Sequence, residues 1–241
     1  MSTEPQPLLG RTALVTGGSR GLGRGMVLAF AEAGASVIIA GRKLDAAEAL
    51  AADVAERFGR EALAVAADMS RWEDCDALVD AAYGRFDRVD VLVNNAGASP
   101  LYPSLDRLTE ERYDETLAVN LKGPFRLTAL VGSRMAAAGG GSIINISSVE
   151  AARPDPAALP YAAAKAGLEA LTVGFADAFG PTVRVNTIRC GMIRAGFVTS
   201  HGDPAVVNEA EDVVGAALYL ATDASAYRTS ATIRLDAGRR R

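Results

Sequence analysis

Residues 16–25 have the sequence TGGSRGLGRG, directly after the apolar run at 13–15 and directly before the helical pattern MVLAFAEAGA. Glycines at a strand-to-helix turn let the backbone approach a pyrophosphate, and the helix N-terminus supplies positive potential. Gly17, Gly21 and Gly23 have the spacing TGxxxGxG, a variant of the dinucleotide-binding fingerprint. The alternative is a tight turn that needs positive φ values, for which one or two glycines would be enough. The segment favours a dinucleotide-binding fold.

The rest of the chain alternates short apolar or β-branched runs with Ala-rich helical stretches, which predicts an α/β fold with a parallel sheet. Apolar positions recur at three and four within 45–59 and 74–87, as expected of the crossover helices that parallel strands need. Ser70 with Glu73 predicts a capping box, and Thr109 predicts an N-cap. We expect strands near 11–16, 36–41, 62–67, 89–94, 142–147, 183–189 and 232–236.

Length and charge limit the class of protein. With 241 residues, 49% of them hydrophobic, the chain fits one domain over 11–241 after an N-terminal extension at 1–10. The formal net charge of -4, without an extended basic stripe, argues against nucleic-acid binding. The N-terminal segment lacks the features of a signal peptide, and no apolar run is long enough to span a membrane. We therefore expect a soluble protein with neither a nucleic-acid nor a membrane partner.

Cysteine and histidine usage narrows the chemistry. Cys75 and Cys190 are far apart and lack CxxC spacing, which argues against a disulfide scaffold or a zinc site and fits a reducing cytoplasm. His201 is the single histidine, so neither a Ser-His-Asp relay nor a multi-histidine metal site is expected. We predict no metal.

The second predicted strand ends in VIIAGRK, which bears on the cofactor phosphate. NAD-selective dinucleotide folds place an acid there for the ribose hydroxyls, but this chain has Gly41 followed by Arg42 and Lys43. Arg20 in the glycine loop is a second guanidinium for a 2′-phosphate, and such contacts are strong. The pattern favours NADP(H); the alternative is that Arg42 and Lys43 only face solvent.

Tyr161 and Lys165 belong to the stretch YAAAK and lie on one face of a predicted helix. One interpretation is an ordinary surface pair. The other is a catalytic tyrosine whose pKa the lysine lowers, since a nearby positive charge favours the phenolate. The stretch alone does not distinguish them.

Five motifs occur in order along the chain: TGGSRGLG, NNAG at 94–97, Asn120, NISS at 145–148 and YAAAK. With these motifs the chain, from Arg11 to about Gly238, resembles the short-chain dehydrogenases/reductases. The resemblance implies a single Rossmann-type, doubly wound, seven-stranded parallel sheet with helices on both faces. It also implies a homotetramer or homodimer that pairs the Ala/Gly-rich helical faces near 125–140 and 162–179.

The same resemblance implies the catalytic residues Asn120, Ser148, Tyr161 and Lys165. Hydride transfer to a ketone leaves negative charge on oxygen, which needs a proton from Tyr161 and a second hydrogen bond from Ser148. Lys165 would lower the tyrosine pKa and hold the nicotinamide ribose, and Asn120 would keep a water in the relay. Ser147 is interpreted as support.

Asp68 matches the family position that contacts the adenine amino group; the alternative is a plain loop acid. Asn94 to Gly97 would line the cofactor and support the central sheet. The full predicted cofactor set is Gly17, Ser19, Arg20, Gly21, Leu22, Gly23, Arg42, Asp68, Met69, Asn95, Ala96, Gly97, Tyr161, Lys165, Gly191 and Ile193.

The segment NTIRCGMIRAGF departs from the family pattern after the sixth strand. Cys190 replaces the usual proline, Gly191 is retained, and Ala195 stands where a threonine is expected. Losing the restricted φ and the hydroxyl is expected to loosen the nicotinamide amide site. Cys190, beside Arg189, is either a reactive thiol or a buried, inert one.

Two further segments also depart from the family pattern. The substrate lid near 192–210 is short, which implies an open site for a bulky or carrier-tethered substrate, or weak activity on small ones. His201 in this segment either touches substrate or is a solvent-exposed loop residue. At 228–230 the chain has RTS where Ile-Thr-Gly is common.

The leading hypothesis is a cytoplasmic NADP(H)-dependent oxidoreductase that interconverts a ketone and a secondary alcohol. A resemblance to 3-oxoacyl-carrier-protein reductase-like members makes a 3-oxoacyl thioester one plausible substrate class. The alternative is a cofactor-binding regulatory or scaffold protein with little or no turnover, which the altered segment after the sixth strand motivates.

Overall fold

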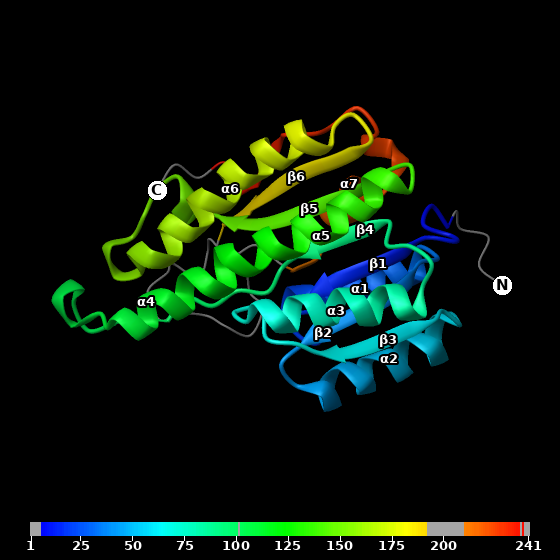
Figure 1. The fold of residues 1–241 in the computed structure, drawn as a ribbon, viewed down its shortest axis with the longest axis horizontal. Coiled ribbons are helices and arrows are strands. Elements are labelled where there is room, and N and C mark those ends of the chain that lie inside the picture. The colour runs from blue at the N-terminus through cyan, green and yellow to red at the C-terminus, as the bar shows by residue number, and fades with distance from the viewer. Residues whose placement is uncertain (1–5, 101, 192–209, 237, 239–241) are drawn as a thin grey trace.

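The computed structural model describes residues 6–100, 102–191, 210–236 and 238, and its framework is a seven-stranded sheet (Figure 1). Neighbouring strands are all parallel, and their order is β3-β2-β1-β4-β5-β6-β7. The predicted seven-stranded, doubly wound parallel sheet is therefore confirmed. The strands are β1 Thr12–Thr16, β2 Ser36–Gly41, β3 Ala62–Ala66, β4 Val91–Asn94, β5 Gly141–Ser148, β6 Val183–Cys190 and β7 Thr232–Leu235.

Helices cover both faces of this sheet. The apolar sides of α1, α2 and α7 pack on one face, and those of α3, α5 and α6 pack on the other, which is turned toward the viewer in Figure 1. The helices are α1 Gly21–Glu32, α2 Leu44–Phe58, α3 Trp72–Arg85, α4 Glu110–Leu117, α5 Gly123–Ala137, α6 Leu159–Phe179 and α7 Ala210–Ala221. A π-helical turn, η2 Ala118–Lys122, joins α4 to α5, and short 3-10 turns are η1 Leu105–Arg107, η3 Val149–Ala151, η4 Pro156–Ala158 and η6 Asp223–Ser225.

The middle residues of β1 and β2 are apolar because both faces of these strands are buried. Leu14 and Ile38 point into the core under α3, α5 and α6, whereas the next residues, Val15 and Ile39, point into the core under α1, α2 and α7. All four side chains are fully buried. This is the usual pattern of a parallel sheet covered by crossover helices.

One predicted helix start is wrong and another is confirmed. Helix α3 begins at Trp72, and the Ser70 hydroxyl donates to Asp68 Oδ1 (2.8 Å) instead of capping the helix. The predicted capping box fails because Arg71, one residue later, is the N-cap residue, so that Glu73 lies at the second helical position and not the third. The Thr109 hydroxyl does cap α4, since it accepts from the Arg112 N–H at 3.3 Å.

Residues 6–10, which the sequence assigns to an N-terminal extension, contact the sheet layer. Leu8 is fully buried in the core beside α1, and its N–H donates to the Ala33 carbonyl at 2.9 Å. Among the described residues, no helix combines the length and the apolar character that crossing a bilayer requires.

Ser230, the last residue of the RTS segment, has a φ of 57°. This left-handed region favours glycine, the residue that the family resemblance expects at this position. The Ser230 N–H donates to the Val185 carbonyl at 2.8 Å, which ties the turn before β7 to β6. The backbone thus keeps a glycine-type conformation without the glycine.

Candidate active site

The predicted site residues gather beyond the carboxyl ends of the strands, on the side where α4 lies in Figure 1. The chain winds outward from β1 in one direction and from β4 in the other, so the strand order switches between these two neighbours. Crevices at such a switch point are the usual ligand sites of doubly wound sheets. The glycine loop follows β1, and NNAG includes the end of β4.

The glycine loop has a backbone shape that only glycine permits at key positions. Gly17 and Gly21 have φ values of 62° and 52°, and a Cβ on Gly23 would lie 2.1 Å from the Gly17 carbonyl oxygen. The Asn95 side-chain amide donates to the Thr16 carbonyl (2.8 Å) and to the Gly17 carbonyl (3.2 Å). NNAG therefore holds the loop in place.

The start of α1 has the features of an anion site. The first N–H groups of a helix lack intrahelical partners, and the N-cap residue Arg20 contributes no side-chain cap. These amides and the positive helix end fit a pyrophosphate. Leu22 and Met69, also predicted to bind cofactor, have buried side chains in the two cores, so only their backbones are available to a ligand.

The end of β2 presents cations and no acid. Arg42 and Lys43 are exposed, and among the described residues no carboxylate forms a salt bridge with Arg42. Asp68 lies near Arg42, whose positive charge acts to lower the Asp68 pKa. Burial alone would raise the Asp68 pKa, but hydrogen bonds from Ser70 together with Arg42 and Arg71 hold it below its usual value.

Ser148, at the end of β5, lies beside the Tyr161 side chain in the first turn of α6 and acts to lower its pKa. The Ser148 oxygen accepts from the Glu150 N–H at 3.2 Å, which leaves its own proton free to donate. Lys165 is one helical turn further along and lies with Nζ 5.6 Å from the Tyr161 ring centre. Its ammonium donates to the Ile146 carbonyl at 2.8 Å.

Asn120 lies in the π-helical turn η2, and π-helical turns often occur at functional sites. Its Nδ2 donates to the carbonyls of Ala98 (2.7 Å) and Thr116 (2.9 Å). Its Oδ1 is buried and has no hydrogen-bond partner among the described residues. A Cβ on Gly97 would lie 2.7 Å from this oxygen and 3.6 Å from Lys165 Nζ, so both atoms border the space beside Gly97.

The family model described as short chain dehydrogenase matches residues 11–204, most of the chain. The protein belongs to the short-chain dehydrogenase family. Its sequence is 34% identical to 3-oxoacyl-[acyl-carrier-protein] reductase FabG of Chlamydia trachomatis, over 96% of this chain and 98% of that protein. It is 36% identical to the probable galactose dehydrogenase GalD of Rhizobium meliloti, over 98% of each chain.

A solved structure has the same fold. It is a 7α-hydroxysteroid dehydrogenase in complex with NADH and 7-oxo glycochenodeoxycholic acid. The TM-score is 0.90 at 27% sequence identity, and the match covers 99% of this chain and 97% of that one. Members of this family are oxidoreductases that act on alcohol and carbonyl groups with a nicotinamide cofactor.

Burial raises the Tyr161 pKa to about 12, and the nearby Ser148 side chain opposes the rise only in part. The lowering that the sequence predicts belongs to the complex with oxidised cofactor, where the Lys165 ammonium acts together with the positive nicotinamide, and it stays a prediction. Burial also lowers the pKa of Lys165 to about 8. The ammonium is directed at the Ile146 carbonyl, and desolvation of the phenol is the largest cause of the Tyr161 shift.

Cys190 is buried, and desolvation raises the pKa of its thiol to about 12. The inert interpretation of this cysteine is therefore confirmed, because the thiolate is the reactive form. Gly191 follows it and donates its N–H to the Leu235 carbonyl at 2.8 Å. Ile193, Ala195, His201 and the lid predicted near 192–210, apart from the start of α7, lie outside the described residues.

One polar cluster, close to Tyr161 and Lys165 on α6, was not predicted from the sequence. Glu169 on α6 accepts from the Ser147 hydroxyl at 2.7 Å and from Arg189 Nε at 2.9 Å. The available signal was the spacing, since Glu169 lies four residues after Lys165 and therefore on the same helix face. The long-range partners are not visible in any local pattern.

A polar recess of about 460 Å³ lies at the opposite, amino-terminal edge of the sheet. Its charged groups are already paired, Arg11 with Asp223 and Arg88 with Asp90, both at 2.6 Å. Arg184 donates to backbone carbonyls and to Ser225. We therefore assign this recess a structural role. In the described part of the chain, no three His, Cys, Asp or Glu side chains form a group that could hold a metal.

The buried ammonium of Lys165 predicts a pH-dependent stability. Its pKa is about 8 in the folded chain and 10.5 ordinarily, so between these values the unfolded chain binds more protons. The unfolding free energy should therefore rise with pH across this window, by up to ~3 kcal/mol relative to a variant without the lysine. Chemical denaturation of the wild type and Lys165→Met from about pH 7 to 10 measures this difference. Cys75 and Cys190, whose ordinary pKa is 9.0, and Tyr161, whose ordinary pKa is 10.0, have pKa values raised by burial and contribute in the opposite sense above those values in the wild type and the variant alike.

Lys122→Met is the matched control, because Lys122 is exposed. The wild type should gain no stability relative to this control as the pH rises through the window. If the difference in unfolding free energy between the wild type and Lys165→Met stays constant with pH, the burial argument is contradicted.

Proposed function

We propose that this protein is an NADP(H)-dependent oxidoreductase that interconverts a ketone and a secondary alcohol, with Tyr161 as general acid and base. The observation that carries the proposal is that Ser148 lies close enough to the half-buried Tyr161 phenol to lower its pKa, beyond the carboxyl ends of the strands. Lys165 Nζ and the unpartnered Asn120 Oδ1 border the same space. Nicotinamide-dependent carbonyl chemistry needs these groups.

Each of the four site residues has its own role in this reaction. A bound nicotinamide supplies or removes the hydride. Tyr161, kept protonated at neutral pH by its raised pKa, donates its proton to the carbonyl oxygen during reduction. Ser148 donates a second hydrogen bond to that oxygen, because its own lone pair already receives the Glu150 N–H. Lys165 would hold the ribose of the cofactor, and Asn120 Oδ1 would accept from a relay water.

The cofactor site combines the glycine loop, NNAG and the ends of β2 and β3. Backbone amides at the start of α1 would bind the pyrophosphate, and Asp68 would contact the adenine amino group. Asp68 is ionised and half-buried, as an acceptor for that group should be.

The preference for NADP(H) is inferred from Arg20 and Arg42. Both guanidinium groups are exposed, and Gly41 leaves no carboxylate to repel a 2′-phosphate. A Cβ on Gly41 would contact the Ser19 hydroxyl at 3.4 Å, so this corner is crowded as well as free of acid. Charge-assisted contacts to phosphate are strong enough to set the choice between cofactors.

The substrate class proposed is a small-molecule or carrier-tethered carbonyl compound or alcohol. The relative from Chlamydia trachomatis is named for a 3-oxoacyl carrier-protein substrate, and the one from Rhizobium meliloti for galactose. A 3-oxoacyl thioester and a sugar are therefore the first two substrates to test, in the reductive and oxidative directions respectively.

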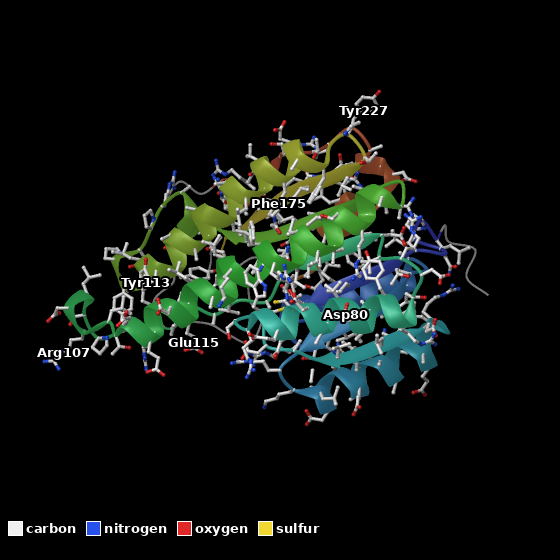
Figure 2. The ribbon with its side chains drawn as sticks, in the orientation of Figure 1. Asp80, Arg107, Tyr113, Glu115, Phe175 and Tyr227 are labelled. Atoms are coloured by element: carbon white, nitrogen blue, oxygen red, sulfur yellow. The ribbon has the colours of Figure 1, made fainter. Side chains whose placement is uncertain are left out.

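The helices α5 and α6 present an apolar surface that supports a homodimer or homotetramer. Phe125 and Val173 are 40% and 57% exposed, and Phe125 lies 5.5 Å from the Phe175 ring (Figure 2). Two copies that pair these helices would cover the surface.

We also propose a cytoplasmic protein whose residues 11–241 form a single cofactor-binding and catalytic domain. Both cysteines are buried and free, which fits a reducing compartment.

The cofactor preference is tested by calorimetric titration with NADPH and NADH. Wild-type protein should bind NADPH more tightly, and Arg42→Ala should weaken NADPH binding about tenfold or more while NADH binding changes less than about twofold. Arg57→Ala, which removes an exposed arginine paired with Asp53, should leave both affinities unchanged. Wild-type preference for NADH would refute the phosphate argument.

The catalytic role is tested with Tyr161→Phe. This variant should lose about 10²- to 10⁴-fold in turnover, because it lacks the proton donor, and should bind NADPH within about twofold of wild type. Tyr227→Phe alters a fully exposed tyrosine (Figure 2) and should retain turnover. If the wild type binds NADPH but turns over neither substrate class, the scaffold hypothesis gains; if Tyr161→Phe keeps full turnover, the mechanism is wrong.

Light scattering tests the oligomer. Wild-type protein should be a dimer or tetramer, and Val173→Glu should shift it toward monomer, since burying like charges opposite each other in a symmetric interface is unfavourable. Leu44→Glu, on the exposed side of α2, should leave the assembly intact. A wild-type monomer would rule the assembly out.

A further inference from the structure

The carboxyl end of β5 binds α6 at three points. Three consecutive residues of the strand contact helix residues that are spaced four apart, so the contacts lie along one helix face. The contacts are Ser148 beside the Tyr161 side chain, the Ile146 carbonyl with Lys165 Nζ (2.8 Å) and the Ser147 hydroxyl with Glu169 Oε1 (2.7 Å).

The third contact is reinforced by an ion pair from β6. Arg189 binds Glu169 through Nε to Oε1 (2.9 Å) and through its terminal nitrogen to Oε2, a bidentate arrangement. The two side chains are only 21% and 15% exposed. Arg189 is the register partner of Ser147 across the β5–β6 pair, so the cluster joins two strands and one helix.

The start of α6 needs such external support. Its N-cap residue, Ala158, makes no side-chain cap, and the helix directly follows the 3-10 turn η4. The Leu159 N–H donates to the Tyr102 hydroxyl at 3.0 Å, so the first turn already relies on a partner from outside the helix. Tyr161 and Lys165 lie in the first two turns, where a helix frays most readily. Glu169 lies one helical turn further from the N-terminus of α6.

We propose that Ser147, Glu169 and Arg189 form a positioning clamp that sets the rotation and axial position of α6, so that Tyr161 and Lys165 meet Ser148. The clamp touches neither the phenol nor the ammonium and acts through the helix. Its effect on turnover rests on the function proposed above, whereas its effect on the helix does not.

The decisive variant is Glu169→Gln. Glutamine has nearly the same size and can still accept the Ser147 hydrogen bond, but it cannot neutralise Arg189. We expect kcat to fall about tenfold or more, because small displacements of reacting groups are costly. The Kd for NADPH should stay within about threefold, since its phosphate site is built on β1 and α1. In hydrogen exchange, with and without NADPH, amides of 159–166 should exchange faster than in wild type.

A matched control comes from a second bidentate pair. Arg126 binds Asp76 through Nε (2.6 Å) and a terminal nitrogen (2.8 Å), between α5 and α3. Asp76→Asn removes the carboxylate charge from that pair and should leave both kcat and the exchange of 159–166 near wild type. Ser147→Ala keeps the ion pair and removes one hydrogen bond, so it should show a smaller version of both effects. If Glu169→Gln does not fold, Ser147→Ala carries the test.

Three results would overturn the clamp: wild-type kcat and α6 exchange in Glu169→Gln, equal losses in Glu169→Gln and Asp76→Asn, or, where Glu169→Gln does not fold, wild-type behaviour of Ser147→Ala. Failure of the proposed function looks different. In that case the wild type has no turnover or Tyr161→Phe keeps it, and the exchange of 159–166 alone decides whether Glu169 positions the helix.

Discussion

The contact between the buried Lys165 ammonium and the Ile146 carbonyl is the constraint on which the site depends. A cation taken out of water is stable only where a fixed acceptor replaces its hydration, and here that acceptor is the backbone of β5. The contact fixes α6 against the end of β5 and thereby brings Tyr161 to Ser148. It also explains the two pKa shifts, since the burial that seats the lysine also desolvates the phenol.

The central sheet meets the same requirement with neutral groups. Asn94 on β4 donates to Asn145 Oδ1 on β5 at 2.8 Å, and Asn145 donates to Thr172 on α6 at the same distance. Thr172 in turn shares a hydrogen bond with Thr187 on β6 (2.8 Å). This buried polar chain links α6 to three strands, so the position of α6 is specified by hydrogen bonds as well as by apolar packing.

Two departures from the family pattern leave the geometry of the described residues intact. Ser230 occupies a left-handed conformation where glycine is common, held by the Val185 carbonyl. Cys190 stands in place of proline, and its buried thiol lies beside the Ile188 carbonyl. The pairing of β6 with β7 continues through this residue, which is the register partner of Leu235. At Ser230 a long-range backbone hydrogen bond holds a conformation that the local residue does not favour.

The amino-acid sequence by itself determined the positions of all seven strands, the Thr109 cap and the glycine loop, because these depend on periodicity and on partners within a few residues. The ordered motifs also identified the family and the four residues that share the candidate site. Only the tertiary structure decided that burial raises the Tyr161 pKa and that Glu169 joins Ser147 to Arg189. Desolvation and the choice among competing hydrogen-bond partners arise only when elements distant in sequence pack together.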